Sequence, residues 1–378
     1  RYKRGSGLPI NTPAVELLEI GAGGGSIARA ERGTIIVGPE SAGAEPGPVC
    51  YGSGGKLPTV TDANLVLGYL DAEFFNNGKM KLHLDAAKQA IDQEISAPLS
   101  LSTEDAAWGI HLIATNNMEH AIRVVSVEQG RDPRRYAMVA FGGAGPLHAA
   151  RLARKIGVPT IIVPRNAGVG SAVGLLRADV RLDAATTRLV RLDQVSGEEL
   201  CHLYKELGHR INSDLSRLTL PNEPIWSRFA YMRYAGQGFE IHVPLPDGEI
   251  DDTFPGKAEA AFREIYGARH QFSDDNATVE GVDWYLAAFV GTPKTETRDE
   301  TPTSSSVVSK VRQAYFPDAG GWIETKVLKR DNIGTVNAVS GPLIVEDPDA
   351  TIVVPPGDSI EMTANGHLLI RINKELAI

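Results

Sequence analysis

The sequence is poor in three features that would each point to a particular class of protein. It has only two cysteines in 378 residues, Cys50 and Cys201, which excludes a disulfide framework and favours a cytoplasmic location. No apolar run approaches the roughly 20 residues that span a membrane, and no signal peptide is visible. The net charge of −9 argues against general binding to nucleic acid or to membranes, because both require a basic face.

Metal-ligand spacings are absent as well. The nine histidines form no His-Glu-x-x-His pattern, and no pair of cysteines could hold zinc. We therefore predict no structural zinc site in this chain. Cys50 lies next to Tyr51 in a glycine-rich loop, and we interpret it as a buried thiol rather than a nucleophile.

Glycine and proline, in contrast, are abundant, with 39 and 23 residues. They concentrate in residues 38–70, GPESAGAEPGPVCYGSGGKLPTVTDANLVLGYL. Glycine lets the backbone approach a ligand closely, and proline stiffens the chain. A long loop that is stiff rather than disordered is usually functional. This loop leads into an amphipathic helix that either Thr61 or Asp62 can cap.

The order of the predicted elements indicates three regions and a linker. Residues 1–185 alternate strands, glycine turns and helices, which is typical of an α/β fold. Residues 186–293 separate helices from strands and indicate an α+β region. Residues 294–310, rich in Thr, Ser and charge, are the predicted linker, and residues 311–378 are predicted to form a small C-terminal β domain.

Capping patterns mark two of the longer helices. Ser102 with Asp105 is expected to begin a helix that runs to Gly130. Ser196 with Glu199 is expected to begin another, which ends near residue 215.

Two glycine-rich turns, each after a predicted strand, are candidate nucleotide-binding sites. Backbone N–H groups in such a turn, together with the dipole of a following helix, attract anions. The same turns also suit tight packing, and neither is a Walker A sequence or a dinucleotide fingerprint. His148, on the first turn of the second site's helix, also suits a packing role. The candidate binding residues are Gly23, Gly24, Gly25 and Ser26 in the first turn, and Gly142, Gly143, Ala144, Gly145, Pro146 and His148 in the second.

Asp62 and Asn64 are the candidate catalytic residues. They stand at the start of the helix that follows the long loop. Asp62 could hold a magnesium-bound water or orient a substrate, and its alternative role is to cap the helix.

Taken together, these segments resemble the hydantoinase A / 5-oxoprolinase family. The likeness extends over nearly the whole chain. It is carried by IGAGGGSIA (20–28), GPESAGAEPGPVCYGSGG with PTVTDANLVLG (38–68), EQGRDPRRYAMVAFGGAGPLHA (128–149) and VP–N–GVGSAVGLLRAD (163–179), and more weakly by MRYAGQGFEIHV (232–243) and SGPLIVEDPDATIVVPPG (340–357).

The resemblance implies an actin-like ATPase core, ribonuclease H-like in fold, within residues 1–185. It implies that ATP and Mg²⁺ are used to activate a carbonyl oxygen by phosphorylation. Such proteins carry phosphate loops N-terminal to residues 20–28, so this chain is expected to be a C-terminal half that holds the adenosine side of the site. The partners expected are the missing N-terminal half, a hydantoinase B-type subunit in a hetero-oligomer, and a cyclic amide or ketone substrate.

Three functions stay open at this point. The preferred one is ATP-dependent hydrolysis of a hydantoin- or 5-oxoproline-type ring. The second is a subunit of an acetone- or acetophenone-type carboxylase, because residues 280–288 (EGVDWYLAA) depart from the Asn-Leu-Arg segment of hydantoinases. The third is a non-catalytic scaffold that binds nucleotide for a partner subunit.

Overall fold

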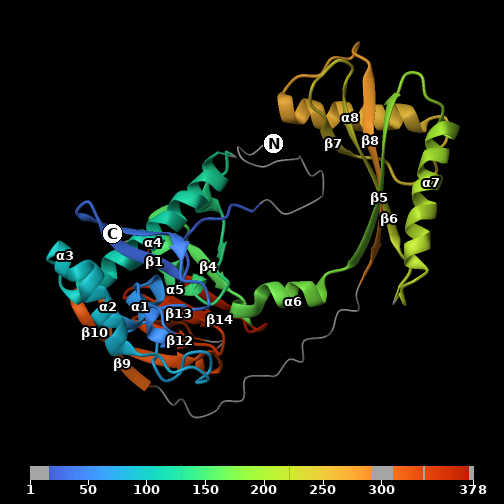
Figure 1. The fold of residues 1–378 in the computed structure, drawn as a ribbon. Coiled ribbons are helices and arrows are strands. Elements are labelled where there is room, and N and C mark those ends of the chain that lie inside the picture. Colours follow the sequence, from blue (N-terminus) through green and yellow to red (C-terminus); the bar gives the residue numbers. More distant parts are fainter. Residues whose placement is uncertain (1–16, 129, 221, 292–309, 335–336, 374–378) are drawn as a thin grey trace. The chain divides into compact units, whose positions relative to one another are not determined.

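The computed structural model describes residues 17–128, 130–220, 222–291, 310–334 and 337–373 (Figure 1). The chain divides into two compact units. Unit 1 combines Arg1–Val173 with Arg298–Ile378, and unit 2 is Gly174–Thr297. Within the described residues, no helix is both long and apolar enough to cross a membrane.

Unit 1 begins with a hairpin and a group of helices. Strands β1 (Ser26–Glu31) and β2 (Thr34–Ser41) pair antiparallel, and helix α1 (Val60–Val66) follows the long loop. Every residue of α1 is buried, and it packs against α2 (Leu84–Ile91) and α4 (Thr103–Val127).

The capping predictions for unit 1 are partly confirmed. Ser102 caps α4, and its hydroxyl accepts a hydrogen bond from the Asp105 N–H. The helix ends at Val127 rather than at Gly130. The cap of α1 is Thr59, so the prediction of Thr61 or Asp62 was wrong; Asp62 is instead the third helical residue of a capping box.

Two sheets complete unit 1. The five-stranded sheet has the order β11 (Val339–Ser340), β14 (Ser359–Met362), β15 (Leu368–Arg371), β4 (Thr160–Val163) and β3 (Met138–Val139). Strands β3 and β4 are parallel and are joined through helix α5 (Gly145–Ile156), which is the predicted α/β connection. The four-stranded sheet has the order β13 (Thr351–Val354), β12 (Leu343–Glu346), β10 (Gly321–Lys329) and β9 (Lys310–Phe316).

The last region differs from the separate small β domain expected over residues 311–378. Strand β15 pairs antiparallel with β4, with Leu368 opposite Val163 and Ile370 opposite Ile161. All four of these side chains are fully buried in one core. An apolar β4 would otherwise be an unpaired edge, so the C-terminal strands complete the sheet of the first region. In Figure 1 these red strands lie beside α5 and β4.

Unit 2 contains, among its described residues, a four-stranded antiparallel sheet and the helices α7 (Gly197–Leu215) and α8 (Phe254–His270). The strand order is β5 (Val180–Arg191), β8 (Val279–Val290), β6 (Ile225–Tyr234) and β7 (Ile241–Pro244). Helix α7 begins at the predicted Ser196–Glu199 capping box, and α8 follows β7. The division at residue 174 replaces the expected boundary at 185. The linker predicted at 294–310 lies, apart from Lys310, outside the described residues.

Candidate functional site

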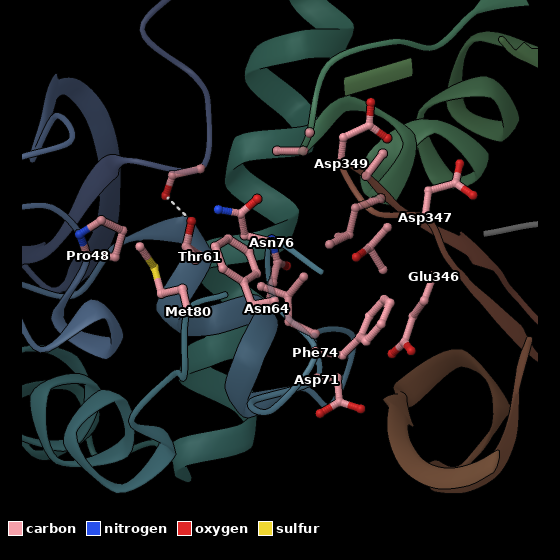
Figure 2. A pocket seen from close by; sticks show the side chains of 18 of the residues that line it. Pro48, Thr61, Asn64, Asp71, Phe74, Asn76, Met80, Glu346, Asp347 and Asp349 are labelled. Carbon is pink, nitrogen blue, oxygen red and sulfur yellow. Dashed lines mark hydrogen bonds between the residues drawn. The ribbon is translucent and has the colours of Figure 1, made fainter. Parts of the chain in front are cut away.

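Unit 1 contains a cavity of about 420 Å³ that three distant parts of the chain enclose (Figure 2). Figure 2 shows Glu346, Asp347 and Asp349 along one side of it and Pro48 and Thr61 on another. The lining residues are Gly24, Gly25, Gly43, Pro48, Tyr51, Thr61, Asn64, Leu70, Asp71, Phe74, Phe75, Asn76, Met80, Gly143, Ala144, Leu147, Glu346, Asp347, Pro348, Asp349, Ala350 and Thr351.

The two predicted glycine turns meet at this cavity. Gly24 and Gly25 come from the first turn, and Gly143 and Ala144 come from the second. Their four backbone N–H groups have no hydrogen-bond acceptor within the described part of the chain. The second pair immediately precedes α5, whose N-terminus carries the positive end of the helix dipole. Unpaired N–H donors at one cavity are suited to an anionic or strongly accepting ligand.

Close packing explains the glycines of the first turn. A Cβ on Gly24 would lie 2.7 Å from Thr61 Oγ1, and the Thr61 hydroxyl donates a 2.8 Å hydrogen bond to the Gly24 carbonyl. A Cβ on Gly25 would lie 2.9 Å from Ser41 Oγ. The absence of side chains therefore lets the turn pack directly on α1 and β2.

The second turn uses its glycines differently. Gly142 has a φ of +88°, and its N–H donates a 2.6 Å hydrogen bond to the carbonyl of Ala167. A Cβ on Gly143 would make only an ordinary contact, 3.5 Å from the Asp349 carbonyl oxygen. Packing therefore does not require a glycine at position 143, and the absence of a side chain leaves the backbone of Gly143 uncovered at the cavity wall.

The remaining predicted binding residues lie outside the lining. Ser26 is buried and supports the first turn, because its hydroxyl accepts from the Gly23 N–H and donates to the Gly21 carbonyl. Gly145 and Pro146 form the first turn of α5. His148, further along α5, is fully buried.

Asp62 also lies outside the lining, although it was a candidate catalytic residue. Its carboxylate is fully buried and accepts hydrogen bonds from the N–H groups of Val49 (3.2 Å), Cys50 (2.7 Å) and Thr59 (2.8 Å) and from the Thr59 hydroxyl (2.8 Å). Burial, and next the charge of Asp62, raise the pKa of the Cys50 thiol. Asp62 thus fastens the proline-rich loop to the start of α1, and Cys50 is an inert buried thiol, as expected.

Asn64, the second candidate catalytic residue, lines the cavity. Its Oδ1 lies 2.8 Å from Nδ1 of His111, a buried residue of α4. The ring of His111 stacks on that of His148, with centroids 4.4 Å apart. Burial lowers the pKa of His111 well below its ordinary value and that of His148 to about 4, so both rings are neutral near pH 7.

Sequence reasoning missed the apolar floor of the cavity. Phe74, Phe75 and Met80 come from a loop between α1 and α2. Asn76 and Asn77 in that loop have φ values of +52° and +58°. The pattern FFNNG was the available signal, since Asn and Gly favour such turns.

Glu346, Asp347 and Asp349 form an acidic wall of the cavity, which sequence reasoning also missed as a site. These residues belong to the segment 340–357, which carried part of the family resemblance. Arg312 donates to Glu346 at 2.6 Å and lies 3.5 Å from Asp71. Arg330 is buried with Asp347, at 2.5 Å, and also donates to the carbonyls of Val163, Pro164 and Gly366. Burial raises the pKa of Asp347, and Arg330 opposes that rise.

Asp349 differs from its acidic neighbours because no hydrogen bond or ion pair joins its carboxylate to another described residue. No group of three or more His, Cys, Asp or Glu side chains in the described ranges is arranged to hold a metal ion.

Comparison with known protein families identifies the family to which this chain belongs. Residues 2–184 match the hydantoinase/oxoprolinase family, and residues 191–374 match the hydantoinase/oxoprolinase C-terminal domain. The chain belongs to the hydantoinase/oxoprolinase family.

Two relatives within this family illustrate its range. The chain is 35% identical to the caprolactamase subunit alpha of Pseudomonas jessenii, over 92% of this chain and 51% of that protein. It is 30% identical to the acetophenone carboxylase gamma subunit of Aromatoleum aromaticum, over 96% of this chain and 51% of that protein. The chain thus spans about half the length of these curated relatives.

Two solved structures share the fold of this family member. A nucleotide-free acetone carboxylase superposes with a TM-score of 0.81 at 24% identity, over 93% of this chain and 52% of that one. The ATP-dependent caprolactamase of Pseudomonas jessenii superposes with a TM-score of 0.73 at 34% identity, over the same shares.

Proposed function

We propose that this chain is the nucleotide-binding part of an ATP-dependent enzyme that phosphorylates a carbonyl oxygen and then hydrolyses a cyclic amide. The observation that carries the proposal is the convergence of two glycine turns on one cavity, with four backbone N–H groups free to donate. Family membership and the ATP-dependent caprolactamase relative support the same reaction class. An actin-like core remains part of this proposal.

The lining suits a nucleotide. The N–H groups of Gly24, Gly25, Gly143 and Ala144 would donate to its acceptor atoms, and the apolar floor around Phe74 would contact the base. Asp349 would accept from a ribose hydroxyl. Mg²⁺ would arrive with the nucleotide, held by its phosphate oxygens, by water and by the N-terminal half that the family resemblance implies.

Such chemistry needs no protein nucleophile. Transfer of the ATP phosphoryl group to the amide oxygen would make the carbon electrophilic. Water would then add to that carbon, the ring C–N bond would break with a proton passing to the nitrogen, and a second water would release phosphate from the resulting acyl phosphate. Phosphoryl transfer depends on positioning and on neutralising charge, and fixed backbone donors provide both without reorganisation. The full enzyme would include an N-terminal half and a hydantoinase B-type subunit, in keeping with relatives that are named as subunits.

A ketone carboxylase is the second candidate. It is favoured by the acetophenone carboxylase relative and by the departure at residues 280–288, which lie within the buried strand β8. A non-catalytic scaffold is the third possibility, and it predicts nucleotide binding without turnover.

The test is ADP release by the complete enzyme, with caprolactam, hydantoin, 5-oxoproline and simple ketones, each with and without bicarbonate. ADP release with a cyclic amide, independent of bicarbonate and matched by ring-opened product, supports the hydrolase. If ADP release required both a ketone and bicarbonate, the carboxylase function would replace the hydrolase function. If the enzyme bound ATP but turned over none of these substrates, the scaffold function would be favoured.

A matched pair of variants tests the cavity itself. Gly143→Val adds bulk on the cavity wall, where a Cβ meets no hard clash, so we expect a folded protein with at least about tenfold weaker ATP binding. Gly256→Val is the control, because Gly256 is exposed on α8 with no atom near its Cβ position. If Gly143→Val bound ATP as tightly as the Gly256→Val control, the proposal that the nucleotide binds in this cavity would be wrong.

A further inference from the structure

A buried set of polar side chains stands directly behind Asn64. His111, Thr115 and His148 are 2%, 0% and 0% exposed. The two imidazole rings are stacked, with an angle of 16° between their planes. The indole of Trp108 stacks on His111 from α4, and the Arg151 guanidinium lies 4.2 Å from the Trp108 ring centroid. Polar groups buried this deeply are costly unless their hydrogen bonds are satisfied, so their arrangement carries information.

Proton counting fixes the state of His148. The Thr115 hydroxyl donates its single proton to the His111 carbonyl, at 2.9 Å. Thr115 Oγ1 is also 3.0 Å from His148 Nδ1, so this oxygen must accept there and His148 must carry its proton on Nδ1. His148 Nε2 is then an unprotonated nitrogen, and it is buried without a partner.

The same reasoning orients Asn64. His111 Nδ1 faces Asn64 Oδ1, and a carbonyl oxygen can only accept, so His111 also carries its proton on Nδ1. The His111 ring cannot flip freely, because it lies between Trp108 and His148. With Oδ1 occupied, the Nδ2 group of Asn64 has no acceptor among the described residues, while the side chain lines the cavity.

We propose that His111, backed by His148 and Thr115, is a positioning residue that fixes the Asn64 amide so that its Nδ2–H group donates to an oxygen of the bound ligand. The acceptor would be a phosphoryl or carbonyl oxygen, and its identity rests on the proposed function. Asn64 would therefore touch the ligand, and His111 would act only through Asn64.

Two substitutions at His111 separate positioning from packing. His111→Asn places a donor nitrogen where Nδ1 was but loses the stacked ring. His111→Phe keeps a ring between Trp108 and His148 but removes the donor. We expect His111→Phe to fold with a Tm close to that of the native enzyme and to bind MgATP, or to bind substrate as judged by KM, about tenfold more weakly.

His111→Asn should show the opposite pattern, with a lower Tm and a ligand affinity within about threefold of the native value. Asn64→Asp keeps an oxygen that accepts from His111 but loses the Nδ2–H donor. It should weaken the binding of MgATP or substrate as much as His111→Phe does. The double variant, His111→Phe with Asn64→Asp, should bind the ligand little more weakly than either single variant. If ligand affinity instead follows Tm across these variants, His111 only packs and the proposal is wrong.

A measurement without ligand keeps this inference separate from the proposed function. Solid-state ¹⁵N NMR of the ¹⁵N-histidine-labelled complete enzyme reports which ring nitrogen carries the proton, and the His111→Asn and His148→Asn variants assign the signals. We expect protonated Nδ1 in both residues. A proton on Nε2 of His111 would overturn the inference, because Asn64 would then present its oxygen to the cavity. If the native enzyme showed the expected tautomers but did not bind MgATP, only the proposed nucleotide site would be contradicted. The effect of His111→Phe and Asn64→Asp on the KM for substrate would then test whether Asn64 contacts the substrate instead.

Discussion

Asp62 is predicted to hold the proline-rich loop closed, and its removal should open that loop locally. Four hydrogen bonds converge on this one carboxylate. In Asp62→Ala, the N–H groups of Cys50 and Thr59 stay buried and lose their acceptor. An unsatisfied buried donor costs about 1–3 kcal/mol, so two of them cost about 2–6 kcal/mol. Loss of an ordinary helix cap costs only about 1 kcal/mol.

Cys50 reports this opening directly. Its side chain is fully buried, so a thiol reagent reaches it only in the opened loop. The rate of labelling follows the population of the open form, and about 3 kcal/mol corresponds to a rise of about 150-fold. The assay is pulse labelling of the complete enzyme with a thiol reagent, read out by mass spectrometry on the peptide that contains Cys50, so that Cys201 and any thiols elsewhere in the enzyme do not contribute to the signal.

The matched control is Ser102→Ala, which removes the exposed cap of α4 and should change Cys50 labelling by less than about threefold. A similarly small change in Asp62→Ala would refute the clamp. If turnover were then lost in a folded, closed Asp62→Ala enzyme, the original catalytic role of Asp62 would be restored.

Three further predictions concern His148, Arg330 and Gly168. The folded-state pKa of His148 is about 4 against an ordinary value of 6.5, so the unfolded chain binds the extra proton and stability falls as pH drops below 6.5. Urea unfolding should show a loss of about 2 kcal/mol from this residue between about pH 7.5 and about pH 5, and His148→Asn should remove that loss. Arg330→Met leaves Asp347 buried and unpaired and should cost about 3–5 kcal/mol in the same assay, whereas adding Asp347→Leu should recover much of it. Gly168→Val places a Cβ 2.1 Å from the Asp349 carbonyl oxygen, and should cost at least about 1–3 kcal/mol and weaken ATP binding measured by calorimetry.

Local signals in the sequence predicted local structure well. The caps at Ser102 and Ser196 were predictable because a hydroxyl followed three residues later by a carboxylate satisfies helix N–H groups wherever it occurs. At the start of α1, Thr59, Thr61 and Asp62 all lie within four positions and each carries an oxygen that could cap the helix. Thr59 prevails because Asp62 can then reach back to the Thr59 N–H while also accepting from Cys50.

Long-range pairing could not be predicted in the same way. Nothing in the alternation of residues 368–371 says that they pair with residues 160–163, about 200 positions earlier, because period-two patterning specifies a face and not a neighbour. The cavity shows the same limit. Its glycine turns were predictable one by one, but Asp349 reaches the cavity because its loop packs beside Gly143 and Gly168, which lie about 200 positions earlier in the sequence.

The buried polar groups around the cavity share one physical role. Asp62 fastens the proline-rich loop, the His111 ring holds Asn64, and Arg330 holds the wall that carries Asp347. Each of these groups is buried, so each must be paired to be tolerated, and each pairing fixes the position of a neighbouring cavity wall. A reaction that proceeds by phosphorylating a carbonyl oxygen depends on donors that are already in place when charge develops. Asp62, Asn64 and Arg330 are each held by hydrogen bonds behind the walls, and the cavity residues Gly24, Gly25, Gly143 and Ala144 keep unpaired backbone N–H groups, an arrangement suited to such a reaction.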